Sequence, residues 1–298
     1  MGALLRAAAL GIQRRFNGFD PATRGPLRPY ASEAHHPIFV IGAPRTGSTL
    51  LYQTMIQQLR VSYISNLMGL VPNRMTSIAR LSRRAMARPR DLRESDYGYV
   101  PGLFSPSEAG AVFRRWFDRD LPEADRVRVR NTFAMLSAIA EAPVLTKNLM
   151  NSLRLPIIHE VLPEARFIHV RRDPLFTAQS LWLARRKHFG NDRKWFSAEP
   201  PGFEAVRHKP PAYQVVWQVR EIEAGIAQFI AGCSAPVIVV NYEDLCGNPG
   251  SVLRTISESC GTDRRDVPAP APSTASNAIA LTPAEWAELE RHHGESSG

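Results

Sequence analysis

The sequence predicts an α/β protein with three layers, in which a central parallel β-sheet is flanked by helices. Short apolar runs alternate with longer segments of helical periodicity, which is the pattern of successive βαβ units. The first apolar run, residues 38–41, passes through the glycine-containing turn GAPRTGST into a helical pattern that continues to about residue 60. A strand, a glycine turn and a helix in this order form the start of such a unit.

The remaining elements follow in chain order. Further strands are expected at 143–147, 166–170 and 237–240. Because 237–240 is an uninterrupted β-branched run, we expect it to be a buried parallel strand. Helices are expected near 155–162, 174–187, 210–230 and 249–259, with Pro174 well suited to a first helical position.

The chain is expected to form one domain, residues 37–262. Residues 1–36 are expected to be a flexible or partly helical N-terminal extension, and residues 263–298 a tail that packs on or near the domain. Two segments interrupt the alternation. Residues 61–135 are arginine-rich and expected to be irregular, and residues 188–211 carry Gly, Pro and Trp. Because insertions at the carboxyl ends of strands usually shape substrate sites, we expect both to border the site.

Composition restricts the classes of partner. The chain of 298 residues carries 37 Lys and Arg against 28 Asp and Glu, a net charge of +9, which favours anionic partners or marks a basic solvated surface. Its 3 cysteines contain no CxxC pair, so neither a disulfide framework nor a zinc site is expected. No apolar run has the length of a membrane span. We expect a cytoplasmic protein with no nucleic-acid partner; peripheral membrane contact through the basic N-terminus stays open, and no oligomeric state follows.

Residues 42–49, GAPRTGST, have the frame of a phosphate-binding P-loop, but Ser48 stands where nucleotide-hydrolysing loops have lysine. The glycines permit a tight turn, and main-chain N–H groups at the helix start face an anion. Arg45 adds a guanidinium suited to phosphate or sulfate. A glycine turn without a ligand is the alternative. The residues expected to bind the anion are Pro44, Arg45, Thr46, Gly47, Ser48 and Thr49.

A second group of polar residues follows the 166–170 strand. Arg172 closes this strand, and Ser180 lies eight residues later in the next helix. The two side chains can close on one phosphate, separate from the anion of the first loop, which implies a ligand with two anionic ends. The alternative is a surface charge pair that caps the helix.

Together these motifs resemble the sulfotransferases that use 3′-phosphoadenosine 5′-phosphosulfate (PAPS), in particular bacterial-type members. PRTGSTLL at 44–51 is similar to the 5′-phosphosulfate loop of that family, and RRDPLFTAQS at 171–180 is similar to its 3′-phosphate motif. YEDLCGNPGSVL at 242–253 is typical of the carboxyl-terminal half, and the resemblance covers about 38–260. It implies a P-loop nucleotide-hydrolase-like sulfotransferase fold, PAPS as co-substrate and no metal. The acceptor would be a hydroxyl or amine on a small molecule, a glycan or a lipid.

The resemblance also implies catalytic residues. Lys147 matches a lysine of the family and is expected to stabilise charge on the bridging oxygen and orient the sulfuryl group; a solvated lysine at a strand end is the alternative. Arg45 is also expected to be catalytic. In cytosolic members a histidine two places after that lysine is the base, but this chain has Leu149 there. Other branches use a glutamate from a segment after the first helix, and our candidate is Glu108, with Glu94 as the second choice.

Glu108 also has a structural interpretation. It stands three residues after Ser105, which is the spacing of a capping box for a helix at 109–117. Two other functions stay open. VIVVNYED at 237–244 can be interpreted as the Walker B strand of a P-loop kinase, although the missing loop lysine counts against it. The basic charge is compatible with a non-catalytic protein that binds anions or membranes.

Overall fold

The computed structural model describes residues 18–87, 100–118 and 120–295. Its centre is a five-stranded sheet of order β2-β3-β1-β4-β5, in which every neighbouring pair is parallel. The strands are β1 (Ile38–Ile41), β2 (Ser62–Tyr63), β3 (Val144–Lys147), β4 (Arg166–Arg171) and β5 (Val237–Asn241). After β1 the chain forms β2 and then β3 on one side of β1 before it crosses to β4 and β5 on the other side, so the direction of winding reverses at β1. The predicted parallel α/β sheet is confirmed.

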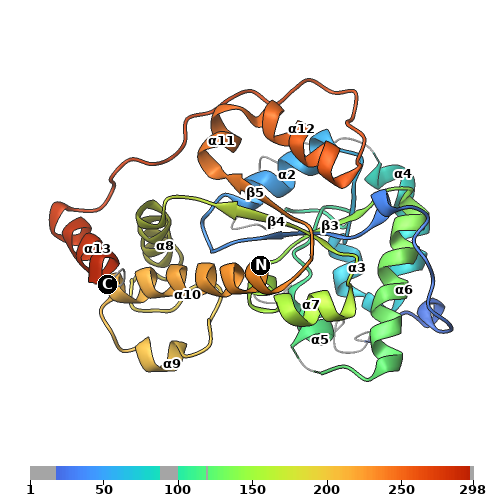
Figure 1. Cartoon of the computed structure of the whole chain (residues 1–298), viewed down its shortest axis with the longest axis horizontal. Helices are drawn as coiled ribbons and strands as arrows, with labels where there is room; N and C mark the ends of the chain where they lie inside the picture. Colours follow the sequence, from blue (N-terminus) through green and yellow to red (C-terminus); the bar gives the residue numbers. More distant parts are fainter. Residues whose placement is uncertain (1–17, 88–99, 119, 296–298) are drawn as a thin grey trace.

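Helices cover both faces of the sheet (Figure 1). One face carries α2 (Ser48–Gln58), α11 (Tyr242–Gly247) and α12 (Pro249–Cys260). The other face carries α5 (Gly110–Phe117), α6 (Glu123–Ala140), α7 (Leu155–Val161), α8 (Pro174–Phe189) and α10 (Pro211–Gly232). The shorter or outlying helices are α3 (Asn66–Leu70), α4 (Met75–Met86), α9 (Phe203–Val206), α13 (Pro283–Glu295), η1 (Pro21–Thr23), η2 (Glu33–His35), η3 (Pro72–Arg74) and η4 (Leu149–Leu153).

The central strand β1 connects the two layers of the core. Its four residues are at most 1% exposed, because a strand between two helical layers is apolar on both faces. Ile38 and Val40 pack in the cluster formed with α2 and α12, whereas Phe39 and Ile41 pack in the cluster formed with α5, α6 and α10. This burial holds the carboxyl end of β1, from which the glycine loop starts, in a fixed position.

The prediction that 237–240 is a buried strand was wrong. β5 is an edge strand that pairs with β4, and Val239 is 51% exposed. A β-branched run favours a strand, but the sequence does not reveal whether a further strand or helix covers its outer side.

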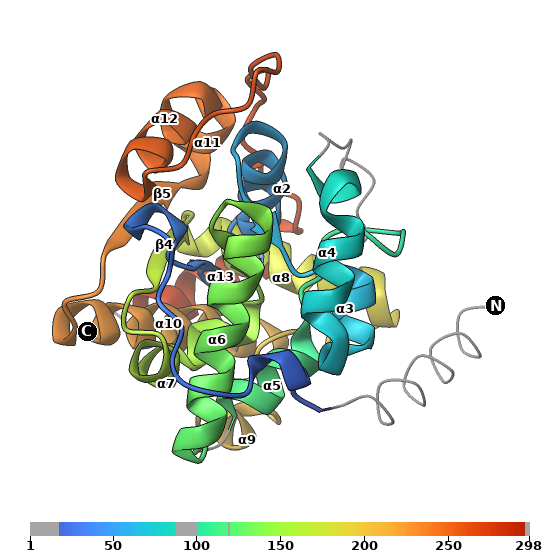
Figure 2. The same cartoon turned by 90° about the vertical axis from the view of Figure 1, so that its right-hand side faces the viewer.

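The segment 61–135 is not irregular in its described part. It contains β2, α3, α4 and α5, and most of α6, and Figure 2 shows α4 and α6 next to each other. The arginines that suggested an irregular segment lie on the exposed side of α4, where Arg80, Arg83 and Arg84 alternate with the buried Ala79 and Ser82. An amphipathic helix with an arginine-rich outer face explains the composition. Glu94 lies outside the described residues.

After α12 the chain runs without regular structure along the domain and ends in α13, which packs on α8 and α10 (Figure 1). The first part of the predicted N-terminal extension, residues 1–17, lies outside the described residues. No helix in the described part of the chain combines the length and hydropathy needed to cross a membrane.

Candidate active site

A cavity of about 580 Å³ lies at the carboxyl ends of β1, β3 and β4, where the winding of the sheet reverses. Ligands of open parallel sheets bind in such crevices. We call it the loop cavity. Its lining residues are Pro44, Arg45, Gly47, Ser48, Thr49, Leu50, Glu108, Lys147, Asn148, Leu149, Met150, Arg172, Ser180, Phe196, Ser197, Ala198, Tyr242 and Ser276.

The loop after β1 has a backbone that few residues adopt. Gly42 has φ of +148° and Gly47 has φ of +91°, and a Cβ at either position would lie 2.5 Å from Val170 O or from Tyr242 Cδ2. Arg45 has φ of +73°, a left-handed conformation that is uncommon for a residue with a side chain. Such strain at a strand end is common where backbone geometry serves a ligand.

The amino end of α2 faces this cavity. Its first three residues, Ser48, Thr49 and Leu50, line the cavity, and the first intrahelical bond runs from Leu51 N to Gly47 O at 3.0 Å. The main-chain amides of the first turn have no intrahelical acceptor, and the described residues provide no side-chain cap. Unpaired amides and the helix dipole together favour an anion at this position.

The loop is anchored from behind. The hydroxyl of Ser152 accepts from Gly42 N and donates to Gly42 O, both at 3.0 Å. Glu223 accepts from Ala43 N at 3.2 Å and contacts the buried His169 at 2.9 Å. Thr46 is 1% exposed, and its hydroxyl donates to Ala43 O rather than lining the cavity. Thr46 can therefore bind an anion only through its main-chain N–H.

Arg172 and Ser180 both contact Arg45 of the glycine loop, although their phosphate was expected to lie apart from that loop. Arg45 Nε donates to Ser180 Oγ at 3.1 Å, and Arg172 Nη1 donates to Arg45 O at 3.0 Å. Arg172 also stacks on the ring of Tyr242 at 4.6 Å. Burial lowers the pKa of Arg172 from its usual range, but a guanidinium keeps its charge. The loop and the strand-end arginine thus form one connected cationic group.

The C-terminal tail completes this group. Arg172 donates through Nε to Asn277 Oδ1 at 3.0 Å and through Nη2 to Ser276 O. Asn277 donates in turn to Glu243 at 2.7 Å, while Asp244 accepts from Asn241 at 3.0 Å. Neither carboxylate lines the loop cavity, which counts against a Walker B role for the 237–244 segment.

Lys147 and Glu108 form an ion pair in the same cavity. The lysine side chain is 3% exposed and the glutamate side chain is 31% exposed. The capping-box interpretation of Glu108 was wrong, because α5 begins at Gly110 and Ser105 Oγ donates to Pro101 O. The carboxylate is therefore available to the cavity.

The segment that carries Glu108 is held by main-chain contacts. Asn148 Nδ2, next to Lys147, donates to Glu108 O at 3.0 Å. Ser107 N donates to Ile64 O at 2.9 Å, and Asn66 N donates to Ser105 O at 2.9 Å. These bonds fix the insertion on the carboxyl side of β2 and β3, so that a residue distant in sequence meets the strand-end lysine.

A turn from the second insertion forms another wall of the cavity. We call residues 195–198 the wall turn. Ser197 has φ of +72°, and Gln218 Nε2 donates to Phe196 O at 3.0 Å and to Ala198 O at 2.6 Å. Gln218 accepts in turn from Arg185, which is 0% exposed and stacks on Trp195 at 4.9 Å. Burial lowers the pKa of Arg185 to about 10.

Several lining residues were not predicted as site residues. Tyr242 begins the motif at 242–253 and follows a predicted strand, so its position at a strand end could have indicated a site residue. Ser276 and Ser197 lie in segments that contain no recognisable motif, so the sequence did not indicate them. Asn148 gave a weak signal only, as the neighbour of Lys147.

The sequence profile described as "Sulfotransferase family" matches residues 37–266. The chain belongs to the sulfotransferase family.

Among solved structures, sulfotransferase STF9 from Mycobacterium avium is 16% identical, with a TM-score of 0.50 over 89% of this chain and 69% of that chain. Sulfotransferase STF1 from Mycobacterium tuberculosis H37Rv is 15% identical, with a TM-score of 0.48 over 95% of this chain and 76% of that chain. The first of these likenesses supports the fold. A comparison with curated proteins gives no match.

Proposed function

We propose that this sulfotransferase moves a sulfuryl group from PAPS to a hydroxyl or amine of an acceptor. The observation that carries the proposal is the convergence of Arg45, Lys147 and Arg172 with the amino end of α2 in one cavity. Three cationic side chains and unpaired amides suit a ligand with two separated anionic ends. Family membership supports sulfuryl transfer as the reaction.

Two subsites suit the two ends of the donor. We assign the loop amides and Arg45, with Ser48 and Thr49, to the 5′-phosphosulfate, and Arg172 with Ser180 to the 3′-phosphate. The hydrogen bond from Arg172 to Arg45 O links the subsites. Arg172 uses three of its five N–H donors on the described residues, so two donors stay open to an anion.

The ion pair suggests how the transfer proceeds. Glu108 accepts the proton of the acceptor hydroxyl or amine while that oxygen or nitrogen bonds to sulfur. Lys147 donates to the oxygen that bridges sulfur and the 5′-phosphate while that S–O bond breaks. The products are the sulfated acceptor and 3′,5′-ADP. A sulfuryl group carries less negative charge than a phosphoryl group. Arg45, Lys147 and the amino end of α2 therefore suffice to balance that charge without a metal ion.

Nucleotide binding tests the donor assignment. We expect 3′,5′-ADP to bind more tightly than 5′-AMP, because only the former engages both subsites. Arg45→Ala and Arg172→Ala should each weaken 3′,5′-ADP binding about 10- to 100-fold, which corresponds to a charge-assisted contact of about 1.5–3 kcal/mol. Arg207→Ala, which removes an exposed arginine paired with Glu204, is the matched control. Isothermal titration calorimetry measures the affinity of the wild-type protein for both nucleotides and the affinity of each variant for 3′,5′-ADP.

Unchanged affinity in both site variants would contradict the assignment. Transfer itself is tested with PAPS and a set of phenols, alcohols and amines, with sulfated products detected by mass spectrometry. Nucleotide binding without any sulfated product would support the site but not the acceptor class.

A further inference from the structure

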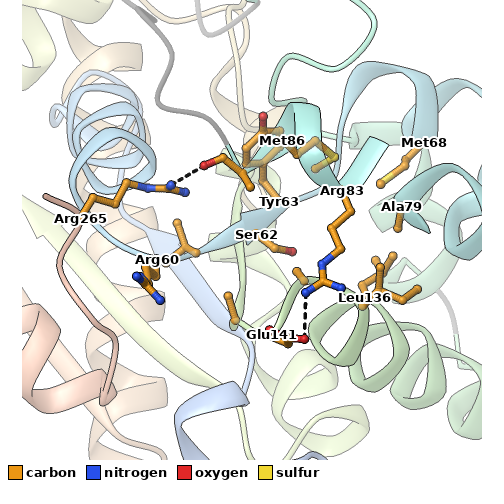
Figure 3. A pocket seen from close by; sticks show the side chains of 15 residues that line it. Arg60, Ser62, Tyr63, Met68, Ala79, Arg83, Met86, Leu136, Glu141 and Arg265 are labelled. Atoms are coloured by element: carbon orange, nitrogen blue, oxygen red, sulfur yellow. Dashed lines mark hydrogen bonds and ion pairs between the residues drawn. The ribbon is translucent and has the colours of Figure 1, made fainter. Parts of the chain in front are cut away.

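A second cavity, of about 330 Å³, lies at the edge of the sheet (Figure 3). It is lined by residues 60–63 around the start of β2, by residues of α4 and by the end of α6 through residue 142. Arg60 and Val61 directly precede β2, and residues 140–142 precede β3, whereas Lys147 lies at the carboxyl end of β3. Of the described residues, none lines both this cavity and the loop cavity. We call it the edge pocket.

The interior of the edge pocket is apolar. Met68, Ala79 and Leu136 form its buried wall, with exposed fractions of 1%, 6% and 3%. The half-buried Met86 and Ile139 extend this wall toward the surface. Two methionines among the five side chains give an adaptable surface, since the unbranched thioether fills irregular space. An apolar cavity of this volume is at the small end of the range for ligand sites, about 300–1,000 Å³.

The rim of the pocket is cationic. Arg60, Arg83 and Arg265 line it, against one carboxylate, Glu141. Arg83 pairs with Glu141 at 2.8 Å, and Figure 3 shows this pair at one side of the pocket and Arg60 and Arg265 at the other. Since Glu141 compensates Arg83, the charge of the other two arginines is left without a carboxylate from the pocket lining.

These two arginines, Arg60 and Arg265, differ in the hydrogen bonds that their guanidiniums make. Arg265 donates through Nε to Leu59 O at 2.8 Å and through Nη1 to Ala87 O at 2.6 Å. Arg60 is exposed, and its guanidinium has no hydrogen-bond or ion-pair partner among residues 18–87, 100–118 and 120–295. Burial lowers the pKa of Arg265, and the neighbouring charge of Arg60 lowers it further. An anion between the two guanidiniums would relieve this repulsion.

We propose that the edge pocket binds a small amphiphile with one anionic head group and an unbranched apolar tail, that is, a medium-chain carboxylate. Its carboxylate lies between Arg60 and Arg265, and its tail lies on Met68, Ala79 and Leu136. This site is separate from the loop cavity, and binding to it is independent of sulfuryl transfer. A failure of the proposed transfer therefore leaves this inference standing, and the reverse also holds.

Calorimetric titration of the full chain with decanoate tests the proposal. We expect saturable binding, with Kd rising about 4-fold for each methylene removed from decanoate to hexanoate, because each buried methylene contributes about 0.8 kcal/mol. Decanol, which keeps the tail but lacks the charge, should bind at least about 10-fold more weakly.

Two variants and one control locate the site. Arg60→Gln removes the exposed head-group contact and should raise Kd for decanoate about 10-fold. Ala79→Leu fills the apolar wall and should abolish the dependence on chain length. Arg84→Gln removes an exposed charge from α4 that does not line the pocket, and should leave Kd unchanged. Thermal melting establishes that each variant is folded, and Arg60→Gln decides the outcome if Ala79→Leu does not fold.

The absence of saturable binding below about 1 mM would overturn the proposal. Equal binding of decanol and decanoate would overturn it as well. So would equal losses in Arg60→Gln and Arg84→Gln, since that result would indicate attraction to the basic surface as a whole.

Discussion

Replacement of Glu108 by glutamine tests the ion pair at the centre of the proposed mechanism. Glutamine keeps the length of the side chain and an oxygen that can accept from Lys147, but it cannot take a proton from the acceptor. We expect the transfer rate to fall by about 10²–10⁴-fold, as is typical for loss of a general base. Affinity for 3′,5′-ADP should not fall, because the Lys147 ammonium loses a competing carboxylate.

The structure also sets the expected cost in stability. Removing one partner of a fully buried ion pair costs about 3–5 kcal/mol. Here Lys147 is 3% exposed, but Glu108 is 31% exposed, and glutamine still offers an acceptor. We therefore expect a loss of about 1–2 kcal/mol in the free energy of unfolding. For a chain of this size this corresponds to a melting temperature lower by about 2–8 °C.

The assay combines three measurements on the same preparation: product formation from PAPS, calorimetric affinity for 3′,5′-ADP, and thermal melting. Glu204→Gln is the matched control, since it makes the same exchange in a surface ion pair with Arg207. A Glu108→Gln variant that keeps more than about a tenth of the wild-type rate would refute the base assignment. Glu94, which lies outside the described residues, would then be the next carboxylate to replace.

Three further predictions address the loop, the wall turn and the metal. Gly47→Ala should lower the free energy of unfolding by about 1–3 kcal/mol and weaken nucleotide binding, because residue 47 has a positive φ and its new Cβ would meet the Tyr242 ring. Gly225→Ala is the control for thermal melting, because the Cβ added there meets nothing within 4 Å. Gln218→Leu should lower the free energy of unfolding by about 3 kcal/mol in a denaturant titration, because it removes an acceptor of the buried Arg185; a loss below about 1 kcal/mol would contradict this. EDTA should leave product formation unchanged, and a loss restored by Mg²⁺ would favour a kinase.

The central strands could be predicted because their burial determines their composition. The expected ranges 38–41, 143–147 and 166–170 agree within one residue at each end with β1, β3 and β4. A strand covered on both faces must be apolar throughout, so its pattern is unambiguous. The same rule failed for 237–240, because an edge strand can carry the same residues.

The convergence of the cationic residues could also be expected. Arg45, Lys147 and Arg172 each follow or end a parallel strand, and the carboxyl ends of such strands meet at one edge of the sheet. The place of Glu108 could not be derived in this way. The place of its insertion after a strand predicted only that the segment borders the site, and the family resemblance singled out Glu108 within it.

The wall turn shows why part of a site cannot be predicted from a sequence with many arginines, since a buried arginine has the same local composition as an exposed one. Arg185 lies in the run LARRKH, which has the composition of a solvated helix end, yet it is 0% exposed. Its Nη1 and Nη2 donate to Gln214 and Gln218, one turn apart on α10, whereas its buried Nε has no hydrogen-bond partner among the described residues. Because Gln218 also holds two main-chain carbonyls of the wall turn, a buried charge on one helix positions cavity residues of a loop. A neutral glutamine pair gives no charge pattern that would indicate this, so this wall of the loop cavity depends on residues outside the motifs identified in the sequence.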